Sequence, residues 1–145
     1  MVELIIVVVV GFFGGIAVGA QAAIAGKMSE RVGSAASSFI VHIGGALTSL
    51  VLLIARRGEQ ISEWRSLPWY MLGSGVLGLI LYLSLSQTIP KLGATTAITL
   101  IIIGQLVAGI TIDHFGAFGT PIRTLDLSRI LACGLLLSGA YILVR

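Results

Sequence analysis

Five long apolar stretches alternate with short polar connectors along the 145-residue chain. A helix needs about 20 mostly apolar residues to cross the hydrocarbon of a bilayer, and each stretch is close to that length. No stretch carries a lysine or arginine in its interior. The pattern predicts five transmembrane helices in an all-α membrane protein, with one domain over residues 1–145. The expected spans are about 4–26, 34–55, 68–89, 94–112 and 127–144.

The composition agrees with this pattern. Hydrophobic residues make up 57% of the chain and charged residues 10%, whereas soluble domains carry about 25% charged residues. The first stretch has no basic residues before it and is too long for a signal peptide, so we expect it to be retained. The net charge is +3, but the basic residues lie singly on connectors, which favours lipid headgroups over nucleic acid as their partners.

The basic residues divide almost evenly between the two sides of the membrane. The side of the N-terminus receives Arg56, Arg57, Arg65, Arg123 and Arg129. The other side receives Lys27, Arg31, Lys91 and Arg145. Because an excess of Lys and Arg normally decides orientation, a chain with so little excess is expected to insert both ways. The alternative is a single orientation decided by one or two charges.

An odd number of spans places the two termini on opposite faces. Two copies inserted oppositely would then form ten helices related by a two-fold axis in the membrane plane. Many secondary transporters contain this symmetry as inverted repeats, with the substrate site at the repeat interface. The expected partners are a second copy in the opposite orientation, the lipid bilayer and a small-molecule substrate.

Small residues recur within the spans, and the chain contains 19 glycines. Helices in lipid associate mainly by close backbone packing at such residues, so a packing role is expected for them. In the first span they recur every four residues, and in the third span they share one face. The expected helix-packing residues are Gly11, Gly15, Gly19, Gly75 and Gly78.

Three polar residues inside the spans are candidates for a solute pathway, because polar groups in hydrocarbon need partners. Gln21 lies late in the first span, and an interhelical hydrogen bond explains it as well as substrate contact does. His42 shares a helical face with Ser38 and Gly45; it could carry protons, although a neutral ring bonded to a neighbour is the commoner case. Gln105, at the centre of the fourth span, suits a neutral or zwitterionic solute or a clamp between helices.

The fourth span ends with an acidic residue that its helix does not favour. An aspartate at a helix C-terminus opposes the helix dipole, so Asp113 is expected to have a compensating partner. His114 or an arginine from a facing connector could supply it. Asp126 or Ser128 can cap the start of the fifth span.

The sequence lacks the residues that several kinds of function require. No Asp or Glu lies inside a span, which argues against exchange of a proton and an organic cation at one buried carboxylate. No metal-ligand spacing, catalytic triad or phosphate-binding glycine loop is present, so neither an enzyme, a metal site nor a cofactor is expected. The single Cys133 cannot form an intrachain disulfide.

The fourth span contains Gly104-Gln105-Leu106, followed by Asp113-His114-Phe115-Gly116-Ala117-Phe118-Gly119. This motif resembles the signature of the YdcZ-like family of small inner-membrane proteins, within the drug/metabolite transporter superfamily. The similarity covers nearly the whole chain and is most specific in the fourth span, at Gly104, Gln105, Asp113, His114, Phe115 and Gly116. Other matching positions are Gln21 before Lys27, Leu67-Pro68-Trp69-Tyr70 with Gly73, Gly75 and Gly78, and the turn Pro90-Lys91-Leu92-Gly93.

The resemblance implies a bacterial inner-membrane protein that is half of a ten-helix inverted-repeat transporter. Members of the family are thought to transport small molecules, and they lack the membrane-embedded glutamate of the small multidrug resistance exporters, as this chain does. We therefore expect transport by alternating access in an antiparallel homodimer, with Gln21, His42 and Gln105 on the pathway. The alternatives are a non-transporting assembly or scaffold protein and one half of a heterodimeric transporter.

Overall fold

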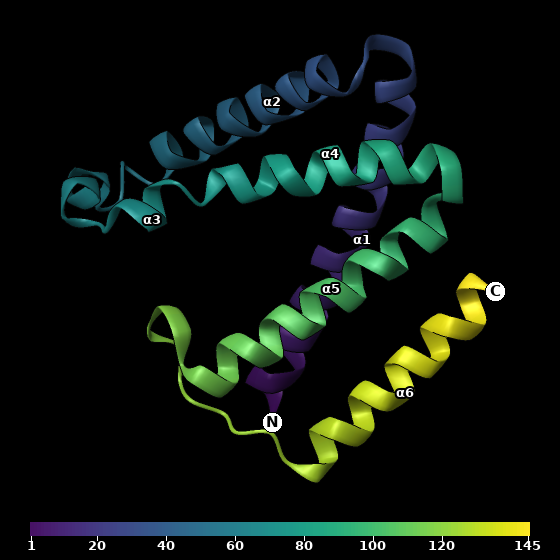
Figure 1. Cartoon of the computed structure of the whole chain (residues 1–145). Coiled ribbons are helices and arrows are strands. Elements are labelled where there is room, and N and C mark those ends of the chain that lie inside the picture. The colour runs from purple at the N-terminus through teal and green to yellow at the C-terminus, as the bar shows by residue number, and fades with distance from the viewer. The chain divides into compact units, whose positions relative to one another are not determined.

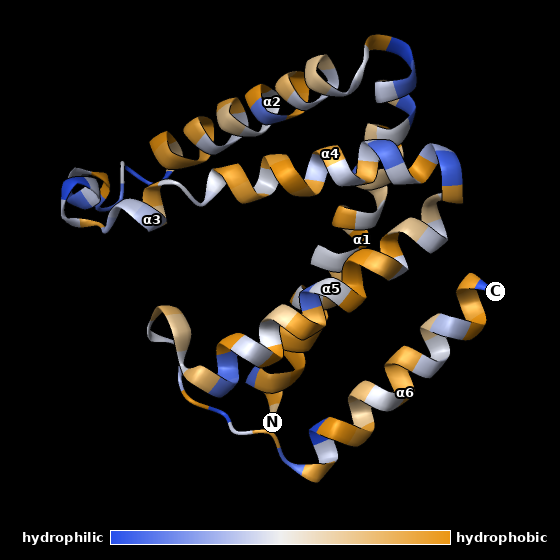
Figure 2. Ribbon diagram, in the orientation of Figure 1, coloured by the Kyte–Doolittle hydropathy of each residue, from blue (hydrophilic) through white to orange (hydrophobic).

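The computed structural model describes all 145 residues and consists of helices without strands. Five helical segments are long and apolar enough to cross a membrane, which confirms the all-α prediction. They are α1 (Val2–Val32), α2 (Ser34–Ala55), α3 with α4 (Trp69–Leu72 and Gly75–Leu92), α5 (Ala94–Phe115) and α6 (Leu127–Val144) (Figure 1). The short 3-10 helices η1 (Ile61–Ser66) and η2 (Ala117–Gly119) lie in connectors. Figure 2 shows hydrophobic residues along all the long helices.

Helix α1 continues beyond the expected span 4–26 and ends only at Val32. No helix-breaking residue lies between the apolar run and Gly33, and Lys27 forms an ion pair with Glu30 one turn later, at 2.9 Å. Such pairs at i,i+3 support a helix. The helix therefore continues into the polar region at the membrane boundary before the chain turns.

Two single glycines form the shortest connectors. Gly33 joins α1 to α2 with φ 85° and ψ 155°, and Gly93 joins α4 to α5 with φ 79° and ψ 160°. This region of backbone space is essentially restricted to glycine, because a Cβ atom would clash there. Both positions therefore require glycine for a reason unrelated to helix packing.

The third span, expected at 68–89, is interrupted near its start. The short helix α3 begins after Pro68 and ends at Leu72, and α4 starts at Gly75. The intervening Gly73 and Ser74 are poor helix formers, which explains the break. At the other end the helix continues past Pro90 to Leu92.

Pro90 leaves one carbonyl of α4 without its helical donor, since proline has no N–H group. The carbonyl concerned is that of Ser86, four residues earlier. The hydroxyl of Ser29 in α1 lies 3.2 Å from this oxygen and 2.7 Å from the carbonyl oxygen of Gly26, and donates to both. The proline thus frees an acceptor that links α4 to α1.

The chain divides into two compact units, Met1–Lys91 and Leu92–Arg145. The first unit is held together where the second half of α1, the first half of α2 and the second half of α4 meet. Its buried residues are mostly small, with one tyrosine and one leucine among them: Ala22, Ala25, Gly26, Ser37, Ser38, Tyr82, Leu85 and Ser86. Small side chains allow the helices to approach closely there.

The second unit is formed by α5 and α6, which contact each other directly. Asp126 caps α6 by accepting a hydrogen bond from the backbone N–H of Arg129, at 2.8 Å. This confirms the expected cap and shows that Asp126, and not Ser128, provides it. The organisation of residues 1–145 as a single domain stays a prediction.

Candidate functional site

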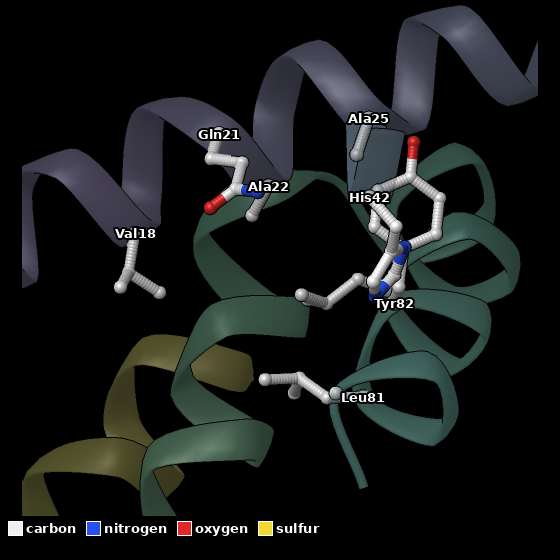
Figure 3. A pocket seen from close by; sticks show the side chains of 9 residues that line it. Val18, Gln21, Ala22, Ala25, His42, Leu81 and Tyr82 are labelled. Carbon is white, nitrogen blue, oxygen red and sulfur yellow. The ribbon is translucent and has the colours of Figure 1, made fainter. Parts of the chain in front are cut away.

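A cavity of about 190 Å³ lies between α1, α2 and α4 in the first unit (Figure 3). Two of the predicted pathway residues, Gln21 from α1 and His42 from α2, line it together. The remaining lining side chains are apolar except for one tyrosine. They are Val18, Ala22, Ala25, Gly78, Leu81, Tyr82 and Leu85.

The helices surround this cavity because their contacts are made by residues with little or no side chain. Ala22 and Ala25 of α1 are almost fully buried. Gly26 allows a closer contact still, since a Cβ atom there would lie 2.7 Å from Cγ2 of Ile89 in α4.

A pair of hydroxyl groups joins α2 to α4 next to the cavity. Ser37 is completely buried, and its Oγ atom shares a hydrogen bond with the hydroxyl of Tyr82, which is 5% exposed. Tyr82 was not among the residues predicted to line a site. A tyrosine hydroxyl in an apolar span needs a partner, so its presence was a signal for such a contact.

His42 sits beside Tyr82, with ring centroids 5.9 Å apart in an edge-to-face arrangement. Its Nδ1 atom lies 2.7 Å from the carbonyl oxygen of Ser38, one turn earlier. The Oγ atom of Ser38 is 3.2 Å from the same nitrogen. The ring is thus held through Nδ1 by Ser38 of its own helix. A histidine ring bonded to a neighbouring residue was one of the two alternatives that the sequence left open.

Gln105, the third predicted pathway residue, lies in the second unit and does not line this cavity. It lines a groove of about 350 Å³ between α5 and α6. Asp113, Arg129 and Cys133 line the same groove. The groove therefore has charged groups at one end and an amide further along α5.

Asp113 has the compensating partner that its place at a helix C-terminus requires. Arg129 of α6 lies 3.5 Å from its carboxylate, and the backbone N–H of Arg123 donates to its carbonyl oxygen at 2.8 Å. The prediction of an arginine partner is confirmed. His114 instead packs edge-on against Phe115, with centroids 4.9 Å apart.

The glycine at position 116 is explained by the way α5 ends. It ends α5 in the left-handed conformation, with φ 60° and ψ 31°, and its N–H donates to the carbonyl of Ile112. Left-handed glycine is a common helix terminator because other residues pay a steric penalty there. A Cβ atom would also lie 2.7 Å from Cγ1 of Ile122.

The glycines predicted for helix packing differ in their surroundings within the chain. Gly11, Gly15 and Gly75 have no atom within 4 Å of where a Cβ would lie. A Cβ atom at Gly78 would lie 3.7 Å from Nε2 of His42, and Gly19 is half-buried. The packing of Gly11, Gly15 and Gly75 against another helix stays a prediction. No three His, Cys, Asp or Glu side chains are grouped so that they could hold a metal ion.

Comparison with known proteins places the chain in a family. The profile of the family described as "Putative inner membrane exporter, YdcZ" matches residues 6–142, which is nearly the whole chain. The chain belongs to the YdcZ family. The inner membrane protein YdcZ of Escherichia coli K12 is 32% identical over 88 residues, covering 61% of this chain and 56% of that protein. The match thus spans just over half the relative's length, and no solved structure matches.

Membership of the YdcZ family confirms the resemblance identified from the fourth-span residues. The family assignment and the five apolar helices make the chain a multi-pass inner-membrane protein of the drug/metabolite transporter type. The family is described as one of exporters and not as one of enzymes.

Proposed function

We propose that this chain forms half of a transporter, which moves a small solute across the inner membrane by alternating access as an antiparallel homodimer. The main observation in favour of transport is the match of residues 6–142 to the family described as "Putative inner membrane exporter, YdcZ". The cavity beside Gln21 and His42 supports it, because polar groups facing a space inside a membrane protein are typical of solute pathways.

Two features support pairing with a second copy: the distribution of basic residues and the exposed apolar surface of α1. The nearly equal numbers of basic residues on the two sides favour insertion in both orientations. The apolar part of α1 is not buried at all within the chain, and Gly11 and Gly15 lie on it with open space around them. In a dimer these glycines would allow a helix of the second copy to approach closely.

The proposed pathway residues are Gln21 and His42, which line the cavity of the first unit, and Gln105, which lines the groove of the second unit. All three offer hydrogen bonds without carrying a fixed charge. This is what a neutral solute requires, since its polar groups need partners but no counter-ion.

Insertion in both orientations predicts that reporters fused to the C-terminus are active on both sides of the membrane. Replacing Arg57 and Arg123 by glutamine should increase the fraction of chains whose C-terminus is cytoplasmic, because it lowers the basic count on the opposite side. Lys91→Gln should shift the fraction the other way. Paired reporters active in the cytoplasm and in the periplasm measure both fractions.

Arg57 and Arg123 are suitable for this test because neither side chain forms an ion pair in the chain. A single orientation of the unaltered protein that persists in both variants would contradict the antiparallel homodimer. It would favour a heterodimer with a partner of opposite charge bias.

Transport itself predicts solute loss from proteoliposomes loaded with a bacterial metabolite extract. Mass spectrometry should show that specific solutes leave vesicles that contain the protein. Gln21→Leu should slow this loss about tenfold or more, because the solute loses a hydrogen-bonding partner in a site of low dielectric.

Gln60→Leu is the matched control, since Gln60 lies in the connector before η1 and outside the cavity. It should transport as the unaltered protein does. If no solute leaves faster than from empty vesicles, the protein is not a transporter of these solutes, and the assembly or scaffold function is favoured.

A further inference from the structure

The hydrogen bonds of His42 determine which of its nitrogens carries the proton. Nδ1 lies 2.7 Å from the backbone carbonyl of Ser38, and a carbonyl oxygen can only accept a hydrogen bond. Nδ1 must therefore donate, so it carries the hydrogen. In the neutral ring the other nitrogen, Nε2, is then unprotonated and presents a lone pair.

Nε2 has no hydrogen-bond partner within the chain. The hydroxyl of Tyr82, whose ring packs edge-to-face with that of His42, is already engaged with Ser37. Gly78 of α4 faces Nε2, and even a Cβ atom at that glycine would lie 3.7 Å from the nitrogen. The absence of a side chain at Gly78 leaves the acceptor accessible from the cavity that His42 lines.

The rest of the lining favours a solute without net charge. No Lys, Arg, Asp or Glu lines the cavity, so an ion would lose its hydration without gaining a counter-charge. Most of the surface is apolar, from residues such as Val18, Leu81 and Leu85. The amide of Gln21 is the only other group that offers hydrogen bonds without a partner in the chain.

The volume limits the size of the solute. A cavity of about 150 Å³ can hold benzene, and this one measures about 190 Å³. It therefore has room for a molecule with one ring or two small fused rings, or for a comparable part of a larger solute.

We propose that the cavity binds a small uncharged solute of this size that carries an N–H or O–H donor, and that Nε2 of His42 accepts this donor. Gln21 contributes a second hydrogen bond, and the apolar lining contacts the body of the solute. The proposal rests on the proposed function, because it assigns a class of solute to the same pathway.

The test compares indole, which has an N–H donor, with 1-methylindole, which lacks it. The protein, labelled with 15N-histidine and reconstituted in nanodiscs, is titrated with each probe and followed by NMR. Indole should move the resonance of the unprotonated nitrogen of His42 upfield, since that nitrogen accepts a hydrogen bond. 1-Methylindole should not move it and should bind about threefold to tenfold more weakly.

Two variants show whether the preference for indole depends on His42, and not on the other histidine or on a general effect of substitution. His42→Phe removes the acceptor but keeps a ring, so it should bind the two probes equally. His114→Phe, at the end of α5 and outside the cavity, should keep the preference for indole. If His42→Phe does not fold, the resonance of the unaltered protein still decides the question.

Equal binding of both probes, or an unmoved His42 resonance at saturation, would overturn the proposal. Its failure can be told apart from failure of the proposed function. A His42 resonance that responds to indole in a protein that releases no solute from vesicles contradicts transport only. Solute release that is unaffected by His42→Phe contradicts only the assigned subsite.

Discussion

Gly26→Ala is expected to destabilise the packing of α1 against α4. The new Cβ atom would lie 2.7 Å from Cγ2 and 3.0 Å from Cβ of Ile89, so the two helices must move apart. Overpacking of this kind typically costs about 1–3 kcal/mol. Unfolding of the purified protein in mixed detergent and SDS, followed by circular dichroism, measures the loss.

Two comparisons show whether this contact is responsible. Gly14→Ala places the same methyl group on the same helix where no atom lies within 4 Å, so it should have little effect or stabilise slightly through helix propensity. Ile89→Ala in the Gly26→Ala background removes the clashing atoms and should recover part of the lost stability. A Gly26→Ala protein as stable as Gly14→Ala would show that α1 and α4 do not pack in this way.

Tyr82→Phe is expected to cost about 1–3 kcal/mol, because it removes the partner of a fully buried hydroxyl. Ser37 is 0% exposed and its only hydrogen bond from the side chain is to Tyr82. In an apolar environment an unpaired hydroxyl loses this bond without gaining one to water. The same unfolding measurement, made on the variant, gives the size of the loss.

The double variant Ser37→Ala with Tyr82→Phe should be more stable than Tyr82→Phe alone, since no unpaired hydroxyl remains. Tyr141→Phe is the matched control, because Tyr141 in α6 is 67% exposed and should tolerate the loss of its hydroxyl. Additive effects of the Ser37 and Tyr82 changes would indicate that the two hydroxyls do not interact.

Much of the fold could be predicted from residue patterns because each span is a local property. A run of apolar residues long enough to cross the bilayer must form a helix, since no water is available to its backbone groups. The exact ends of the helices were harder to predict. The extension of α1 to Val32 depends on the absence of a helix-breaking residue before Gly33. The interruption at Gly73 depends on a few weak helix formers. Both effects are too small to place a helix boundary from the sequence.

The candidate site was predicted in part. Gln21 and His42 could be selected because polar groups inside apolar spans are costly, but this reasoning does not say which of them meet. Tyr82 was missed as a site residue because its hydroxyl can be satisfied by many partners, and Ser37 is identified only by the arrangement of α2 and α4. Gln105 was selected by the same reasoning and lies in a different unit.

The sequence by itself determined that the protein is an all-α membrane protein with five spans, nearly balanced charges and the fourth-span residues of the YdcZ family. These properties depend on composition and on neighbours along the chain. Only the tertiary structure decided that Ser29 of α1 lies against the carbonyl that Pro90 leaves free, that Arg129 pairs with Asp113, and that Nε2 of His42 faces a cavity opposite Gly78. Those contacts join residues on separate helices, so they depend on how the helices pack and not on neighbours along the chain.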